Sequence, residues 1–202
     1  MIALIDYHAG NLTSVKKAFA ALGADLFVPT EAADLHRAAA IVVPGVGHFA
    51  ATQALTSEWI DQVQAHVEAG RPLLGICLGM QWLFEGSEEA PECAGLGLLA
   101  GSCYRLPAVS NGTSVKIPHV GWNALDVSRC DSIVEGVAPG AQVYFTHSFV
   151  APVTDDTVAI TEHGQGFAAV VQRGRVAGVQ FHPEKSGEVG LTILRNFLRL
   201  AR

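Results

Sequence analysis

Apolar and polar positions along the first 85 residues alternate in blocks that predict strands and helices in turn. Short apolar runs at residues 1–6, 24–28, 39–44 and 72–77 are typical of buried strands. Apolar residues three or four apart predict helices over residues 10–24, 57–70 and 78–86, the first with an apolar face of Leu12, Val15, Phe19 and Leu22. Asn11 is a candidate N-cap and Gly23 a candidate C′ residue for that helix. Strands alternating with helices favour a parallel sheet covered on both faces.

The pattern changes in the second half of the chain. Residues 95–181 carry short apolar runs separated by Gly, Pro and Asp, which is typical of strands joined by hairpins, one of them turning at "RGRV". Residues 186–202 predict a closing helix whose apolar face carries Val189, Ile193, Phe197 and Leu200. No internal repeat or linker divides the chain. We therefore expect a single α/β domain over residues 1–202, with an open mixed, mostly parallel sheet and helices on both faces.

Composition narrows the class of protein. The 202 residues are 50% hydrophobic, which is enough for one sizeable core. The net charge is −6 and the basic residues are scattered, so nucleic acid is not an expected partner. No basic leader precedes Asp6, and the most apolar window, residues 38–51, is too short to span a bilayer. Without a Cys-x-x-Cys or zinc-like spacing, the four cysteines fit the reducing cytoplasm: Cys77, Cys93, Cys103 and Cys130.

Candidate chemistry begins at Cys77, at the junction of a predicted strand and a predicted helix. "GICLG", residues 75–79, has the form Gly-x-Cys-x-Gly, the thiol version of a nucleophile elbow. Such a turn strains the central residue, and Gly75 and Gly79 remove collisions on either side. The sulfur would then lie at a helix N-terminus, which favours a thiolate. The five residues fit equally well a buried apolar thiol between two packing glycines.

A base for this thiol is expected among the eight histidines. His36 and His66 lie on predicted helices among polar residues, where we expect them to be solvated. His182 ends an apolar strand in "VQFHPE", and Glu184, two residues on, can hold one nitrogen of its ring. Pro183 marks the strand end, where open α/β sheets bind ligands. The alternative is a strand-end histidine beside a solvated glutamate.

A third candidate element is the loop "VVPGVGHF" after the third predicted strand. Gly45 and Gly47 flank Val46, so this loop can aim backbone N–H groups inward as an oxyanion hole. The N–H of Leu78, directly after the candidate nucleophile, would be the second donor. A phosphate-binding loop and a plain turn are the alternatives.

Taken together, these elements resemble the class I glutamine amidotransferases. "GICLGMQ" and "FHPE" carry the resemblance to the class. "DYHAGNLTSV", "VPGVGHF", "KIPHVGWN", "YFTHSF" and "HPEKSGEVGL" narrow it to the glutaminase subunits of imidazole glycerol phosphate synthase, over nearly the whole chain. The nearest rivals are amidotransferase subunits for pyridoxal phosphate or anthranilate synthesis. A free-standing γ-glutamyl thiol hydrolase and a non-catalytic adaptor are also open.

The resemblance implies a two-protein enzyme of histidine biosynthesis. This chain would hydrolyse L-glutamine to glutamate and ammonia. A (βα)8-barrel cyclase subunit, joined to it in a heterodimer, would use the ammonia to make imidazole glycerol phosphate and an aminoimidazole carboxamide ribonucleotide. No metal and no organic cofactor are expected in this chain.

The resemblance also implies roles for individual residues. Cys77 is the expected nucleophile, His182 its base, and Glu184 the residue that orients His182, while the N–H groups of Val46 and Leu78 hold the oxyanion. The remaining roles are implied in two sets. The substrate-binding set is Gly47, Gln81, Ser148 and Phe149. The partner-facing set is Asn11, His119, Trp122, Asn123 and Lys185, with Trp122 as the anchor.

Two positions depart from the family pattern, and one loop is a candidate switch. His8-Ala9 stands where the family usually has Gly and a small or apolar residue, and Phe149 stands where Tyr is common. A glutaminase that runs without its partner wastes glutamine. We therefore expect the Gly45–Val46 peptide to turn over, presenting the Val46 N–H when the partner holds its substrate. The alternative is a rigid loop whose glycines serve packing.

Overall fold

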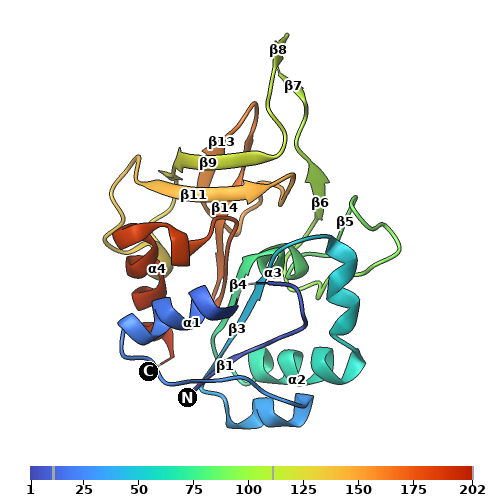
Figure 1. The fold of residues 1–202 in the computed structure, drawn as a ribbon, viewed down its shortest axis with the longest axis vertical. Coiled ribbons are helices and arrows are strands. Elements are labelled where there is room, and N and C mark those ends of the chain that lie inside the picture. The colour runs from blue at the N-terminus through green and yellow to red at the C-terminus, as the bar shows by residue number, and fades with distance from the viewer. Residues whose placement is uncertain (11, 111, 202) are drawn as a thin grey trace.

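A central sheet of eight strands organises the molecule in a computed structural model that describes residues 1–10, 12–110 and 112–201 (Figure 1). The strand order is β10-β13-β14-β15-β4-β3-β1-β2. Five strands pair in parallel, namely β1 (Ile2–Leu4), β2 (Leu26–Phe27), β3 (Ala40–Gly45), β4 (Leu73–Cys77) and β15 (Val176–Val179). The antiparallel extension is β14 (Gly166–Arg173), β13 (Thr157–Glu162) and β10 (Asp126–Val127). The expected open mixed α/β sheet is confirmed.

Helices cover both faces of this sheet, as the sequence predicts. α1 (Leu12–Ala21) and α4 (Gly187–Leu200) pack on one face, where Phe19 and Phe197 share a buried cluster with Val42 of β3. α2 (Ser57–Glu68) and α3 (Leu78–Trp82) pack on the other, with Ile41 of β3 (Figure 1). Successive side chains of a strand point to opposite faces of the sheet, so neighbouring residues of β3 pack in different hydrophobic clusters. The 3₁₀ turns are η1 (Ala32–Arg37), η2 (Phe49–Ala54), η3 (Ser132–Val134) and η4 (Pro183–Lys185).

The second half adds small sheets beside the central one. β9 (His119–Ala124) and β11 (Gln142–His147) form an antiparallel ribbon. β12 (Phe149–Val150), β6 (Ser102–Arg105) and β5 (Gly86–Ser87) form a three-stranded sheet. β7 (Val109–Ser110) and β8 (Thr113–Ser114) form the projecting tip in Figure 1. One end of the ribbon, where His119 pairs with His147, borders the candidate site.

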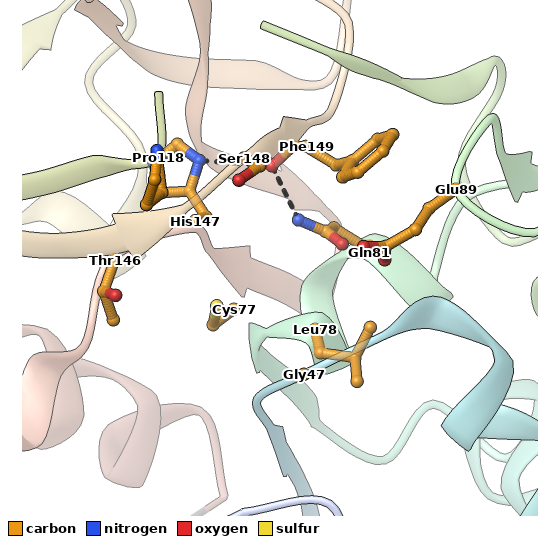
Figure 2. Close-up of a pocket in the computed structure, with 10 residues that line it drawn as sticks. All are labelled: Gly47, Cys77, Leu78, Gln81, Glu89, Pro118, Thr146, His147, Ser148 and Phe149. Atoms are coloured by element: carbon orange, nitrogen blue, oxygen red, sulfur yellow. Dashed lines mark hydrogen bonds between the residues drawn. The ribbon is translucent and has the colours of Figure 1, made fainter. Parts of the chain in front are cut away.

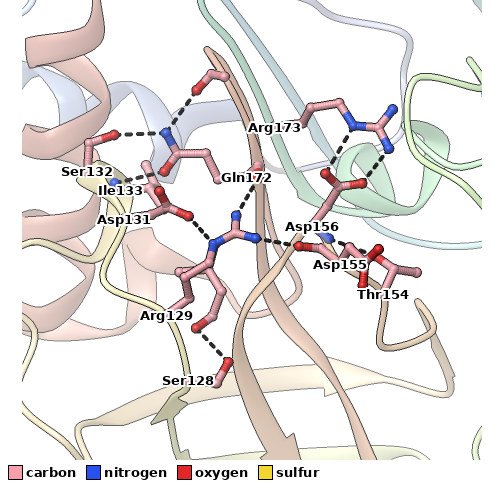
Figure 3. A network of polar contacts seen from close by, with 12 residues as sticks. Ser128, Arg129, Asp131, Ser132, Ile133, Thr154, Asp155, Asp156, Gln172 and Arg173 are labelled. Carbon is pink, nitrogen blue, oxygen red and sulfur yellow. Dashed lines mark hydrogen bonds and ion pairs between the residues drawn. The ribbon is translucent and has the colours of Figure 1, made fainter.

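An arginine-centred network holds the loops at one end of β14 (Figure 3). Arg129 donates to the Asp131 carboxylate at 2.5 Å and to the carbonyl of Gln172 at 2.8 Å. Arg173 forms an ion pair with Asp156 at 2.5 Å. These side chains are partly exposed, so their ion pairs contribute little stability, and their bonds to backbone carbonyls mainly position the loops.

One local prediction is wrong. His66 lies on the inner face of α2 and is fully buried rather than solvated, with Nε2 at 3.0 Å from the carbonyl oxygen of Pro72. Burial lowers the pKa of His66 to about 4. The polar neighbours in sequence mislead here, because residues three and four apart, not adjacent ones, share a helix face. Among the described helices, none is long and apolar enough to cross a membrane.

Candidate functional site

The turn from β4 into α3 places Cys77 at the edge of the sheet. Cys77 has φ 53° and ψ −109°, a strained conformation for a residue with a side chain. A Cβ at Gly75 would lie 2.5 Å from the carbonyl oxygen of Gly79, and a Cβ at Gly79 would lie 1.8 Å from that of Val43. The predicted reason for the two glycines is therefore confirmed: side chains there would collide with backbone.

His182 and Glu184 lie at the same edge as Cys77. β15 runs parallel to β4 with Val179 opposite Ile76, so the residues that follow each strand emerge together. His182 Nδ1 is 2.9 Å from Glu184 Oε1, and the two side chains are 3% and 6% exposed. The alternative of a solvated glutamate is therefore wrong.

The proton on the His182 ring is held by its neighbours. Burial opposes a charge on the ring, but the favourable interactions of the ring with the nearby Cys77 and Glu184 side chains outweigh it and raise the pKa of His182 to about 9. Because a carboxylate only accepts hydrogen bonds, Nδ1 donates to Glu184. Nε2 is buried without a hydrogen-bond partner among the described residues, so it is the nitrogen left for proton transfer.

A cavity of about 230 Å³ opens directly over Cys77 (Figure 2). It brings together most of the residues predicted from the sequence, namely Gly47, Cys77, Leu78, Gln81, Ser148 and Phe149. Four further lining residues have no role assigned from the sequence, although three of them stand in "KIPHVGWN" and "YFTHSF", namely Glu89, Pro118, Thr146 and His147. Glu89 adds a carboxylate to one side of the cavity, and its Oε2 accepts a hydrogen bond from the Phe49 N–H at 2.7 Å.

The loop predicted to help form the oxyanion hole lies beside the cavity. Of the two predicted donors, the one on this loop is already hydrogen-bonded. The Val46 N–H donates to the carbonyl of Ala9 at 2.8 Å. Leu78, the source of the other predicted donor, begins α3 beside Cys77, and the first N–H groups of a helix have no partner within it. In this conformation the Val46 N–H is turned to the N-terminal segment and not offered to an oxyanion.

Tyr7 packs beneath the same loop. A Cβ at Gly45 would lie 1.9 Å from the Tyr7 hydroxyl oxygen, so glycine is required at position 45 for packing. That hydroxyl is buried without a hydrogen-bond partner among the described residues. Burial and the nearby charge of Cys77 raise the pKa of Tyr7, which keeps the hydroxyl neutral.

The carbonyl of Phe149 organises the opposite wall of the cavity. It accepts hydrogen bonds from Gln81 Nε2 at 2.8 Å and from His147 Nδ1 at 3.1 Å (Figure 2). Because a carbonyl only accepts, His147 carries its proton on Nδ1, and its Nε2 accepts from His119 Nδ1 at 3.2 Å. His119 Nε2 then accepts from the Asn123 amide at 3.3 Å. Each ring is held neutral and in one tautomer.

The pKa values of these two histidines agree with that assignment. Burial, followed by the neighbouring His119 ring, lowers the pKa of His147 to about 3. Burial, followed by the stacked His163 ring at 4.0 Å between centroids, lowers the pKa of His119 to about 4. The chain of hydrogen bonds from Asn123 to Phe149 therefore needs no charge, and it joins β9 to the cavity wall.

The residues predicted to face a partner separate into surface and interior positions. Trp122 is 57% exposed on β9, and Lys185 Nζ lies 5.7 Å from the centroid of the Tyr144 ring. His119 is 3% exposed, so it lies below this surface, because alternate residues of β9 point inward. Asn123 is half-buried and bonded to that interior, and Asn11 lies outside the described residues.

No group of three or more His, Cys, Asp and Glu side chains within the described ranges has the arrangement of a metal site. The cavity has the Cys77 thiol at its base and the Glu89 carboxylate and several backbone groups in its walls, and the buried His182–Glu184 pair lies at the same edge of the sheet. Such a set is suited to nucleophilic attack on a small polar acyl compound.

Comparisons with known proteins agree with this chemistry. The sequence profile described as "Glutamine amidotransferase class-I" matches residues 3–201. A Bacillus cereus protein named "Imidazole glycerol phosphate synthase subunit HisH" is 42% identical over 200 residues, covering 98% of this chain and 93% of that protein. A Geobacillus kaustophilus protein of the same name is 45% identical over 206 residues, covering 100% and 97%.

Solved structures share the fold. One described as a "glutamine amidotransferase" superposes with a TM-score of 0.76 at 23% identity, covering 100% of this chain and 99% of that one. PurLQS from Thermotoga maritima superposes with a TM-score of 0.74 at 17% identity, covering 100% and 98%. At these identities the likeness concerns the architecture.

Proposed function

Because this chain belongs to the class I glutamine amidotransferases, and among them to the family of imidazole glycerol phosphate synthase subunit HisH, we propose that it is the glutaminase half of that synthase. It hydrolyses L-glutamine through a Cys77–His182–Glu184 triad and passes the ammonia to a (βα)8-barrel cyclase subunit. The observation that carries the proposal is the strained Cys77 elbow at the same sheet edge as the buried His182–Glu184 pair.

The triad chemistry follows from where the protons lie. With its raised pKa, His182 keeps a proton at neutral pH, as a thiolate–imidazolium pair requires. The sulfur anion attacks the side-chain amide carbon of glutamine, and His182 gives its Nε2 proton to the departing ammonia. The neutral ring then takes a proton from water, which attacks the thioester and releases glutamate and the thiolate. Glu184 holds the ring in one orientation throughout.

The cavity walls supply fixed partners for the amino-acid end of glutamine. Glu89 is placed to meet the α-ammonium group, and the backbone at Ser148 and Phe149 to receive the rest of that end. Gln81 uses Nε2 on Phe149 and Gln180, so its Oε1 is the atom it can offer to a substrate N–H. The contacts of Phe149 are made by its carbonyl, so the missing tyrosine hydroxyl removes none of them.

The oxyanion loop is the proposed control point. The Val46 N–H is bound to Ala9, so the hole holds only the Leu78 donor until the Gly45–Val46 peptide turns over. Removing one donor costs roughly 10²–10³-fold in kcat, about 2.7–4 kcal/mol. A partner that releases Val46 from Ala9 therefore switches on a triad that is already assembled.

The partner surface and the compartment complete the proposal. Trp122, 57% exposed, is the anchor, and Lys185 lies over the ring of Tyr144, which also contacts Trp122, while Asn123 lies half-buried behind this surface. Residues 1–202 act as one glutaminase domain, and the pair with the cyclase has lyase activity overall. All four cysteines carry free thiols, which supports a reducing compartment, the cytoplasm.

A substitution of the nucleophile tests this function. In the complex with a candidate cyclase, Cys77→Ala should abolish glutamine-dependent product formation and leave ammonia-dependent formation intact. Cys93→Ala is the matched control, since Cys93 is buried to the same degree, 5% exposed, but lines no part of this cavity. Loss of both activities, or of neither, would refute the assignment. A free-standing thiol hydrolase would instead be fully active without the cyclase.

A further inference from the structure

We propose that Gln180 is a further catalytic residue of the glutaminase, whose side-chain amide donates a hydrogen bond to Cys77 Sγ and stabilises the sulfur anion. The proposal rests on the function proposed above, and it adds a group outside the Cys–His–Glu triad. The evidence is the position of Gln180, the forced orientation of its amide, and its burial.

The sheet register brings Gln180 to the nucleophile. It follows β15 by one residue, and β15 pairs with β4 so that Val179 lies opposite Ile76, the residue before Cys77. Gln180 Nε2 is 3.6 Å from Cys77 Sγ, within hydrogen-bond reach of a sulfur acceptor. Gln180 is fully buried, so bulk water does not compete with Cys77 for the hydrogen bond of this amide.

A backbone carbonyl sets which end of the Gln180 amide faces the sulfur. The carbonyl of Phe149 accepts only, so the atom of Gln81 at 2.8 Å from it is the amide nitrogen. The same nitrogen is 3.1 Å from Gln180 Oε1, which accepts its second hydrogen. Turning the Gln180 amide over would place two N–H groups face to face. Its Nε2 therefore points at Cys77, whatever the charge on the sulfur.

The chemical consequence is differential binding of the anion. An N–H group aimed at sulfur binds a thiolate more strongly than a thiol or a thioester, since hydrogen bonds to charged groups are about twice as strong as neutral ones. No proton moves: the amide keeps both hydrogens while the sulfur gains and loses its bond to the glutamyl carbon. Gln180 thus holds the sulfur side of the ion pair, as Glu184 holds the imidazolium side.

The cavity leaves Gln180 out of substrate contact. Its wall includes Gln81 but not Gln180, so the direct effect of Gln180 is on the sulfur. A purely structural role, acting through Gln81, would change the affinity for glutamine instead. The two roles therefore differ in the kinetic constant they affect: the direct role predicts a lower kcat with little change in KM, and the structural role predicts a higher KM with kcat unchanged.

The test compares Gln180→Met and Gln180→Glu with the wild type. Met has nearly the same shape but no donor, and Glu places an anion against the sulfur. We expect iodoacetamide to alkylate Cys77 of the full chain about 10–100-fold more slowly at pH 7 in Gln180→Met, as the loss of a hydrogen bond to a charged group implies. Gln180→Glu should be slower still. In the complex with the cyclase, glutamine-dependent kcat should fall by a similar factor with KM within about twofold.

Gln172→Met is the matched control. Gln172 is a buried glutamine on the adjacent β14 whose side chain makes three hydrogen bonds, to Ile133, Ser132 and Gly174, and none to Cys77. It should lose stability and keep the wild-type alkylation rate. Ammonia-dependent product formation checks that each variant still folds and docks. Inactivity of the wild type with glutamine would refute the proposed function, whereas an active wild type with unchanged Gln180→Met alkylation would overturn this inference alone.

A measurement on the unaltered Gln180 covers the case in which its variants do not fold. In ¹⁵N-labelled wild-type chain, one side-chain amide proton of Gln180 should be shifted downfield by the sulfur anion, and the shift should disappear in Cys77→Ser at pH 7. Identical Gln180 amide shifts in the two proteins would overturn the inference. So would a Gln180→Met variant that raises KM and leaves both kcat and the alkylation rate unchanged.

Discussion

His8 and Cys77 are the non-glycine residues at positive φ in the described part of the chain, and they differ in what they gain. At Cys77 the strain lifts the thiol to the edge of the sheet. At His8, φ is 62°, the side chain is 93% exposed, and the N–H bonds to Asp6 Oδ1 at 2.9 Å, a contact open to any residue. The family usually has glycine there, and the left-handed backbone explains that preference.

Replacing His8 with glycine should therefore stabilise the fold. The left-handed conformation costs an L-residue roughly 1–2 kcal/mol, which glycine avoids. The extra conformational freedom of glycine in the unfolded chain opposes folding by roughly 0.5–1 kcal/mol and offsets part of this gain. We expect His8→Gly to raise the free energy of unfolding by roughly 0.5–1 kcal/mol, measured by urea titration.

Gly23→Ala provides the matched control for that substitution. Gly23 has φ +69° and open space where a Cβ would stand, so only backbone strain would be added. The Gly23→Ala substitution should lower the free energy of unfolding by about 1 kcal/mol. A lower stability for His8→Gly would show that the histidine side chain contributes a contact outweighing the strain.

At the scale of elements, the β9–β11 ribbon and α2 carry histidines that fold in the neutral state. Burial lowers the pKa of His119 and His66 to about 4 and that of His147 to about 3. Each group binds its proton more weakly in the folded chain than in the unfolded one, where the pKa is about 6.5. Their stabilising contribution is present above pH 6.5 and is lost as the pH falls toward 4.

The resulting prediction is acid lability with a defined origin. At pH 5, each of these histidines should lower the free energy of unfolding by about 2 kcal/mol relative to pH 7. His66→Gln keeps a donor for the Pro72 carbonyl and should remove about one third of this loss, as measured by urea titration at several pH values. His182 has the opposite sign: its pKa of about 9 favours folding below pH 6.5, and that contribution fades as the pH rises through 9.

How well an element could be predicted depends on the length of its pattern. α1, α2, α4 and β3 have strong apolar periods, and the sequence locates them to within a few residues. The apolar pattern does not single out β9, because Val120 and Trp122 are exposed and their strand shows no simple apolar face. Strand pairing across 28 residues, which brings His119 to His147, has no local signature at all.

The residues of the candidate site also differ in how well the sequence predicts them. Cys77, His182 and Glu184 stand in short motifs whose spacing reflects one turn or one strand end, so they could be found in the sequence. Glu89 and Gln180 reach the site through loop and sheet register, which depend on the whole fold. The only sequence signal for Gln180 is its position, two residues before His182 at the same strand end.

At the scale of the whole molecule, Tyr144 connects the exposed surface around Trp122 to His182. Trp122 stacks edge-on against Tyr144 with ring centroids 6.1 Å apart, and Lys185 lies over the same ring. The carbonyl of Tyr144 accepts from the His182 N–H at 2.9 Å. A protein docked on Trp122 would therefore contact residues bonded directly to His182, the proposed base, while the Val46 N–H is bonded to the carbonyl of Ala9.

This arrangement predicts that turnover depends on the partner. Glutaminase turnover should be about 10²–10³-fold lower for the isolated chain than for the complex with the cyclase and its ligand, because the Val46 donor is bound to Ala9 in the single chain. Val46→Pro has no N–H to present, so its complex should show glutaminase turnover close to that of the isolated wild-type chain, with ammonia-dependent synthesis retained. Equal turnover of the isolated wild-type chain and its complex would mean that the loop is rigid and that Gly45 serves packing against Tyr7. Full activation of Val46→Pro would mean that a group other than the Val46 N–H completes the oxyanion hole.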